Sequence, residues 1–228
     1  MRRWPVGMIG GAPGAFMGDV HRRAMALTGR FELIAANLSR DAKRASKAGA
    51  DLGLKPERCY EDWQIMASAE SRRTDGIALA VIVTPNNMHL SVASAFLKTG
   101  IPVLCEKPLT TEMSAARRFV EQFPNTSSQM ALAYTYSGYA MVREARQLVK
   151  NGTLGALRSI QIVYLQDWPG HTEAAGGWRL DEPIGGAWGC PGDLGTHAFH
   201  PADFLSGFMC HRCSSFVSTL VVFLTLSV

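Results

Sequence analysis

The chain has 228 residues, of which 47% are hydrophobic and 18% are charged, and its formal net charge at pH 7 is +4. These values are typical of a globular protein of one or two domains and exclude a disordered, collagenous or disulfide-stapled chain. The basic residues form doublets but no run, so no nucleic-acid partner is expected.

Cysteine usage and apolar tracts bear on the compartment. The five cysteines are odd in number and irregularly spaced, which favours a reducing, cytoplasmic location. No apolar stretch of the secretory type opens the chain, and the late apolar tract 216–228 is too short to span a bilayer. No membrane partner is therefore expected.

Residues 1–130 alternate short apolar runs with amphipathic stretches. The runs predict strands at 6–9, 31–36, 77–83, 102–105 and 130–134, and the stretches predict helices at 17–28, 41–52, 62–71, 88–99 and 112–123. Ser39 is a candidate cap of the second helix. This alternation predicts a Rossmann-type α/β domain with a doubly wound parallel sheet.

Residues 131–228 have a different pattern and predict an incomplete α/β second domain. Helices are expected at 141–150 and 193–205, and an alternating segment at 157–166 predicts a long strand. Between them, the stretch 167–192 is rich in Gly and Pro and has no periodic pattern. A loop of this length inside a domain is usually functional or disordered.

A glycine-rich turn follows the first predicted strand and opens the first predicted helix. It contains Gly10, Gly11, Gly14 and Gly18, with Ala12 where a strict G-x-G-x-x-G pattern has its second glycine. Such a turn can present backbone N–H groups and the positive end of a helix to a pyrophosphate. A purely structural turn is the alternative.

The second predicted strand ends without the acidic residue that favours NAD in folds of this kind. Instead, Ser39 and Arg40 follow it and are suited to a 2′-phosphate, which favours NADP. Asp41, one residue farther on, could still reach a ribose. A helix cap followed by a solvated arginine is equally compatible with this sequence.

Two further motifs follow predicted strands, at the edge where open α/β sheets bind ligands. Thr84-Pro85-Asn86, with His89 shortly after it, follows the strand 77–83, and Asn87 is also a good helix cap. Glu106-Lys107-Pro108 follows the strand 102–105. Lys107 could hold a substrate hydroxyl and favour its deprotonated form, and its bond to Pro108 is a candidate cis peptide.

Asp193 and His197 lie four residues apart in a predicted helix and so share one face. A carboxylate beside an imidazole fixes its tautomer and raises its basicity, as a general base requires. The sequence is equally compatible with an aspartate that only caps the helix and a histidine that is exposed on its surface. A zinc site at Cys210-His211-Arg212-Cys213 is disfavoured, because no second ligand pair has matched spacing.

In their order and spacing these motifs resemble the Gfo/Idh/MocA family of NAD(P)-dependent oxidoreductases, over about residues 5–207. Further anchors are 152–155, 178–179 and 192–197. The resemblance implies that the first domain, 1–130, binds NADP or NAD, and that the sheet of the second domain, 131–228, supports a homo-oligomer. It implies that Lys107 orients the substrate, that His197 takes the hydroxyl proton as hydride leaves, and that Asp193 assists.

The implied substrates are sugars, inositols and related polyols. The cofactor contacts expected from the motifs and the resemblance are Gly10, Gly11, Ala12, Gly14, Gly18, Ser39, Arg40, Thr84, Pro85, Asn86, His89 and Glu106.

The sequence departs from the family in two places. The methyl group of Ala12 is expected to crowd the cofactor, and the resemblance fades after Gly207. The uncharged, β-prone tail 214–228 suggests a truncated chain or an altered reading frame, with the tail pairing with 157–166. A non-catalytic nucleotide-binding protein and an inactive fragment are the alternatives to an active enzyme.

Overall fold

The computed structural model of the chain describes residues 3–39, 41–124, 129–166, 178, 181–186 and 191–208. The chain divides into two compact units, Met1–Ala133 and Tyr134–Val228. Four of the features predicted from the sequence lie wholly or mostly outside the described residues: Arg40, most of the loop 167–192, the cysteine-containing motif at 210–213 and the tail 214–228.

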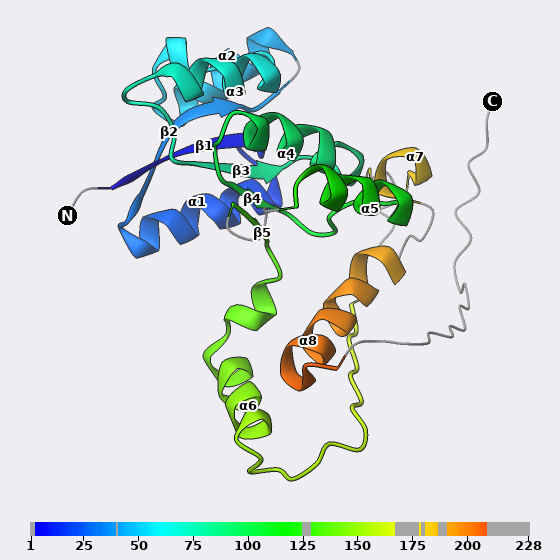
Figure 1. Ribbon diagram of the computed structural model, residues 1–228. Coiled ribbons are helices and arrows are strands. Elements are labelled where there is room, and N and C mark those ends of the chain that lie inside the picture. Colours follow the sequence, from blue (N-terminus) through cyan, green and yellow to red (C-terminus); the bar gives the residue numbers. More distant parts are fainter. Residues whose placement is uncertain are drawn as a thin grey trace. The chain divides into compact units, whose positions relative to one another are not determined.

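The described part of the first unit contains a five-stranded sheet in which every neighbouring pair is parallel (Figure 1). Its strands are β1 (Trp4–Gly10), β2 (Phe31–Asn37), β3 (Leu79–Val83), β4 (Val103–Cys105) and β5 (Met130–Leu132), arranged in the order β2-β1-β3-β4-β5. The order reverses between β1 and β3, and open α/β sheets bind ligands beside such a reversal. The predicted Rossmann-type fold is confirmed.

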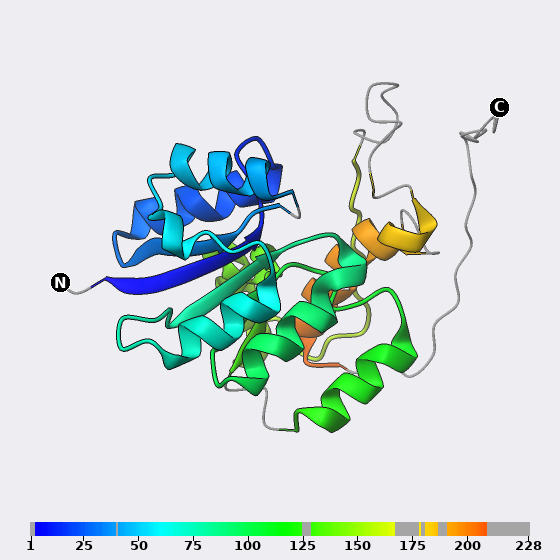
Figure 2. The same cartoon turned by 90° about the horizontal axis from the view of Figure 1, so that it is seen from above.

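Helices cover both faces of this sheet, as Figure 2 shows. On one face lie α1 (Phe16–Thr28) and α2 (Ala42–Asp51), and on the other lie α3 (Trp63–Arg72), α4 (His89–Lys98) and α5 (Met113–Gln122). A buried apolar cluster lies on each face of the sheet. Because side chains alternate along a strand, Met8 of β1 belongs to the cluster on the face of α1 and α2, and Ile9 belongs to the cluster on the face of α3, α4 and α5. The apolar strands are therefore buried on both sides.

Local signals set several helix ends as predicted, but two caps differ. Asp62 caps α3 by accepting hydrogen bonds from the N–H groups of Gln64 and Ile65. The cap of α2 is Asp41, whose carboxylate accepts from Arg44 N, whereas Ser39 Oγ accepts from the N–H of Asp41. A 3-10 turn, Asn86–Met88, precedes α4, so Asn87 is not its cap.

A buried ion pair ties α3 to its neighbouring loops. Arg58 and Glu70 are 4% and 1% exposed, and Arg58 Nη2 donates to Glu70 Oε2 at 2.9 Å. The other carboxylate oxygen accepts from the Tyr60 hydroxyl at 2.6 Å, and Ile77 N donates to Oε2 at 3.2 Å. Burial, with the hydrogen bond to Glu70, raises the pKa of Tyr60 to about 12.

The described residues of the second unit contain helices but no strand. They form α6 (Ala140–Lys150), α7 (Glu182–Gly185), a π-helical turn (Pro191–Gly195) and α8 (Thr196–Ser206), so the first turn of the predicted helix 193–205 is π-helical. The predicted strand at 157–166 is wrong, because alternation specifies an extended chain, whereas a strand also needs a hydrogen-bonded neighbour. Leu165 in this segment is 84% exposed.

Bilayer crossing needs a long apolar helix, and no helix in the described ranges meets that requirement. The tail 214–228, whose pairing with 157–166 is predicted, lies outside these ranges.

Replacing Glu70 with leucine removes the buried carboxylate partner of Arg58 and leaves its buried guanidinium with only the exposed Asp75, whose Oδ1 is 3.3 Å from Nη1. We expect Glu70→Leu to lower the free energy of unfolding by about 3–5 kcal/mol in urea denaturation. The double variant Arg58→Met/Glu70→Leu should recover much of that loss, since no charge is left buried. As a control, Asp51→Ala removes the exposed pair with Lys47 and should change stability by at most about 0.5 kcal/mol. Equal losses in Glu70→Leu and Asp51→Ala would contradict the structural role of the buried pair.

Candidate functional site

The glycine-rich turn joins β1 to α1 beside the reversal of strand order. Gly10, Gly11 and Gly14 have φ values of 78°, 70° and 87°, which side-chain-bearing residues rarely adopt. A Cβ on Gly18 would lie 2.4 Å from Gly11 O, so the first turn of α1 packs directly on the backbone of the preceding turn. The turn predicted from the sequence is therefore built on close backbone contact.

The N-terminus of α1 presents backbone N–H groups. Ala15 precedes the helix and makes no side-chain cap hydrogen bond, while its own N–H closes the turn on Ala12 O at 2.9 Å. The first N–H groups of a helix have no partner within the helix, and the helix dipole is positive at this end. Ala12 packs partly buried against the cluster that contains Met8.

Arg22, in the second turn of α1, fixes the glycine-rich turn. Its guanidinium donates hydrogen bonds to Gly11 O and to the carboxylate of Asp19. This pair belongs to none of the motifs predicted from the sequence. The spacing Asp19–Arg22, three residues apart on one helix, was the available signal.

The end of β2 is occupied by hydrogen bonds between neighbouring segments. Asn37 is buried and donates from Nδ2 to Tyr60 O at 2.8 Å. The carboxylate of Asp41 is engaged in capping α2, which leaves it less suited to the alternative role of contacting a ribose. Lys43 and Arg44 are exposed in the first turn of that helix.

The turn after β3 holds a buried hydroxyl. Within the described ranges, Thr84 Oγ1 is shielded from solvent and has no hydrogen-bond partner. A buried polar group without a partner costs about 1–3 kcal/mol, so this oxygen is suited to a ligand that supplies one. Asn86, the other polar residue of the motif, is also buried.

The segment after β4 is held by two histidines. Glu106 Oε1 lies 2.8 Å from Nε2 of His21 in α1, and both side chains are largely buried. The Lys107–Pro108 bond is cis, as expected. His89 is 1% exposed, with Nδ1 2.7 Å from Pro108 O and Nε2 3.0 Å from Thr84 O, and burial lowers its pKa.

The structure thus brings three of the predicted motifs to one edge of the sheet. Each motif follows one of three neighbouring strands (Figure 1): the glycine-rich turn follows β1, Thr84-Pro85-Asn86 follows β3, and Glu106-Lys107-Pro108 follows β4. A tight glycine turn, a helix N-terminus and a buried hydroxyl without a partner fit a dinucleotide. Lys107 belongs to this first unit, whereas Asp193 and His197 belong to the second.

In the second unit, His197 lies among tyrosine rings. Its imidazole stacks on Tyr164 at a centroid distance of 5.4 Å and meets Tyr136 edge-on at 5.1 Å. The hydroxyls of these two tyrosines are 2.7 Å apart. His200, one turn farther along α8, stacks on Tyr134 at 4.2 Å, and desolvation lowers its pKa. These tyrosines belong to none of the motifs predicted from the sequence, because local periodicity does not single them out.

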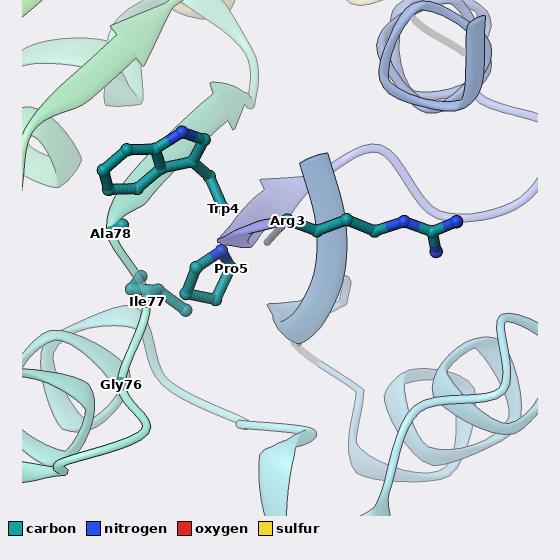
Figure 3. Close-up of a pocket in the computed structure, with 6 residues that line it drawn as sticks. All are labelled: Arg3, Trp4, Pro5, Gly76, Ile77 and Ala78. Carbon is teal, nitrogen blue, oxygen red and sulfur yellow. The ribbon is translucent and has the colours of Figure 1, made fainter. Parts of the chain in front are cut away.

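A separate pocket of about 270 Å³ lies at the opposite edge of the sheet (Figure 3). It is lined by Arg3, Trp4, Pro5, Gly76, Ile77 and Ala78, at the N-terminal start of β1 and just before β3. It shares no residue with the candidate site.

Two family models match the chain. The oxidoreductase family with an NAD-binding Rossmann fold matches residues 5–134, and the GFO/IDH/MocA C-terminal domain matches residues 142–222. The second match extends past Gly207, where the resemblance noted from the sequence ends.

Individual proteins agree with these matches. The chain is 31% identical over 209 residues to the uncharacterized oxidoreductase YfiI of Bacillus subtilis, covering 89% of this chain and 53% of that protein. It is 28% identical to levoglucosan dehydrogenase of Pseudarthrobacter phenanthrenivorans, covering 91% and 52%.

A crystal structure of an inositol dehydrogenase homolog complexed with NAD+, from Azotobacter vinelandii, has a TM-score of 0.81 and 28% identity. The match covers 90% of this chain and 54% of that one. The chain therefore spans about half the length of each of these three proteins.

Adding a methyl group at Gly18 tests the contact between α1 and the turn. Because the new Cβ would meet backbone atoms of Gly11, we expect Gly18→Ala to lower the free energy of unfolding by about 1–3 kcal/mol in urea denaturation. Gly138→Ala is the matched control, since a Cβ there has no atom within 4 Å. Equal stability of the two variants would contradict the close packing at Gly18.

Proposed function

The chain belongs to the Gfo/Idh/MocA oxidoreductase family, and we propose that it binds NADP(H) and transfers hydride between this cofactor and a sugar, inositol or related polyol. The observation that carries the proposal is the convergence of three polar motifs at the ends of β1, β3 and β4. The names of the matched dehydrogenases support the substrate class. A cytoplasmic location and association through the second unit stay predictions.

The glycine-rich turn and the N-terminus of α1 would hold the pyrophosphate through backbone N–H groups. The Thr84 hydroxyl would gain a partner from the bound nucleotide, and Pro85 and Asn86 would line its neighbourhood. Ser39 and Arg40 would receive the 2′-phosphate. The nicotinamide ring, when bound, supplies the acceptor or donor of hydride, and the chain positions and polarises the substrate.

For the proton transfer, we assign one residue to each task. Lys107 donates a hydrogen bond to the reacting hydroxyl and favours its deprotonated form. His197 takes the hydroxyl proton as a general base, and Asp193 assists at the substrate. Tyr164, stacked on the imidazole, limits the orientations that His197 can adopt.

The cofactor preference is tested at Arg40. We expect NADPH to bind more tightly than NADH, as measured by the fluorescence of the reduced nicotinamide. Arg40→Ala should weaken NADPH about ten- to a hundredfold, the value of a charge-assisted hydrogen bond, and leave NADH unchanged. Arg30→Ala, an exposed arginine at the other end of β2, is the control. Equal weakening of both cofactors by Arg40→Ala would remove Arg40 from the 2′-phosphate site.

The catalytic assignment is tested at His197. With a panel of sugars and polyols, His197→Ala should lower kcat about 10²–10⁴-fold and leave the Kd for NADPH unchanged, because a base acts in the chemical step. Phe199→Ala, an exposed residue of the same helix, should change neither value. Tight NADPH binding without turnover of any panel member would favour a non-catalytic nucleotide-binding protein. An unchanged kcat in His197→Ala would exclude it as the base.

A further inference from the structure

His89 occupies an unusual place in the first unit. It is the first residue of α4 and is 1% exposed, yet both ring nitrogens lie within hydrogen-bond distance of a backbone carbonyl. The two carbonyls belong to different loops, Thr84 after β3 and Pro108 after β4. A buried ring with both nitrogens so placed has none left for a bound nucleotide, the role expected for it from the sequence.

The chemistry of the two contacts distinguishes them. A carbonyl oxygen only accepts, and a neutral imidazole carries a single N–H. Burial lowers the pKa of His89 and so favours the neutral ring, although the contacts with the Pro108 and Thr84 carbonyls and the nearby Glu106 favour the charged one. The neutral ring has one proton to donate. The shorter contact, 2.7 Å from Nδ1 to Pro108 O, is the better hydrogen bond, and Nε2 then faces Thr84 O unprotonated.

The residues on either side of Lys107 are both held by histidines. Before it, the Glu106 carboxylate is hydrogen-bonded to the ring of His21 in α1. After it, the carbonyl of Pro108 is in hydrogen-bond contact with the ring of His89 in α4. Two helices that each begin beside the candidate nucleotide site therefore hold the residues on both sides of this lysine, through the Glu106 side chain and the Pro108 backbone carbonyl.

We propose that His89 is the positioning residue for Lys107, donating Nδ1–H to Pro108 O and so fixing the 106–108 segment against the first turn of α4. The proposal rests on the proposed function only in the catalytic role given to Lys107. It assigns His89 to holding the loops and not to contacting the cofactor.

The test compares His89→Leu, which removes the hydrogen bond, with His89→Gln, which can still donate one, in the full 228-residue chain. The readout is the NMR signals of the Glu106 and Lys107 amides and of the ¹³C-methylated Lys107 amine. We expect His89→Leu to shift or broaden these signals and His89→Gln to restore them in large part. Val92→Ala, a fully buried substitution one turn farther along α4, is the control for lost packing and should leave them unchanged.

Signals of Lys107 that are unchanged in His89→Leu, or changed equally in Val92→Ala, would overturn the proposal. The tautomer provides a second measurement on the native chain, which does not depend on any variant folding. ¹⁵N spectra of His89 should show a protonated Nδ1 at neutral pH. A protonated Nε2 with a bare Nδ1 would remove the link to Pro108 and overturn the proposal.

Lys107→Met separates this proposal from the proposed function. If Lys107→Met leaves turnover unchanged, the catalytic role of Lys107 falls, and with it the purpose of the link, whatever the NMR signals show. If Lys107→Met abolishes turnover while His89→Leu leaves the Lys107 signals in place, the proposed function stands and the positioning role of His89 is wrong.

Discussion

The reversal of strand order between β1 and β3 is the constraint on which the candidate site depends. The chain leaves β1 toward β2 on one side and returns past β1 to form β3 on the other. Since β1, β3 and β4 are parallel neighbours, the segments that follow all three begin at the same edge of the sheet. The backbone path alone thus brings residues 10–18, 84–89 and 106–108 together, before any side chain is considered.

Side-chain hydrogen bonds then fix these segments relative to one another. The adjacent residues His21 and Arg22 of α1 reach Glu106 and Gly11 respectively, so one helix holds two of the three segments. His89 lies at the end of the third segment, as the first residue of α4, and its Nδ1 reaches Pro108 O of the segment after β4. Because these side chains are largely buried, water competes little for their hydrogen bonds. A site held in this way in the free protein loses less entropy when a ligand binds.

The sequence predicts the first unit closely because its signals are local. Each signal acts within a few residues of the structure that it specifies. Examples are the apolar runs of the strands, Asp62 at the N-terminus of α3 and Gly29, which ends α1 in a left-handed conformation. The polar links are different, since His21 and Glu106 are 85 positions apart and no periodicity connects them. The sequence does not determine the cap of α2, because Ser39 and Asp41 both favour a helix start and only the backbone decides between them.

In the second unit, alternation at 157–166 predicted a strand, although it specifies only which side chains share a side. What the structure places there instead is Tyr164, which joins Tyr136 and His197 in one aromatic group drawn from three separate segments. A base that takes a substrate proton becomes a cation, and the face of an aromatic ring attracts a cation at such distances. The stacked ring of Tyr164 therefore complements the role proposed for His197, and its hydroxyl, bonded to Tyr136, keeps that ring in place.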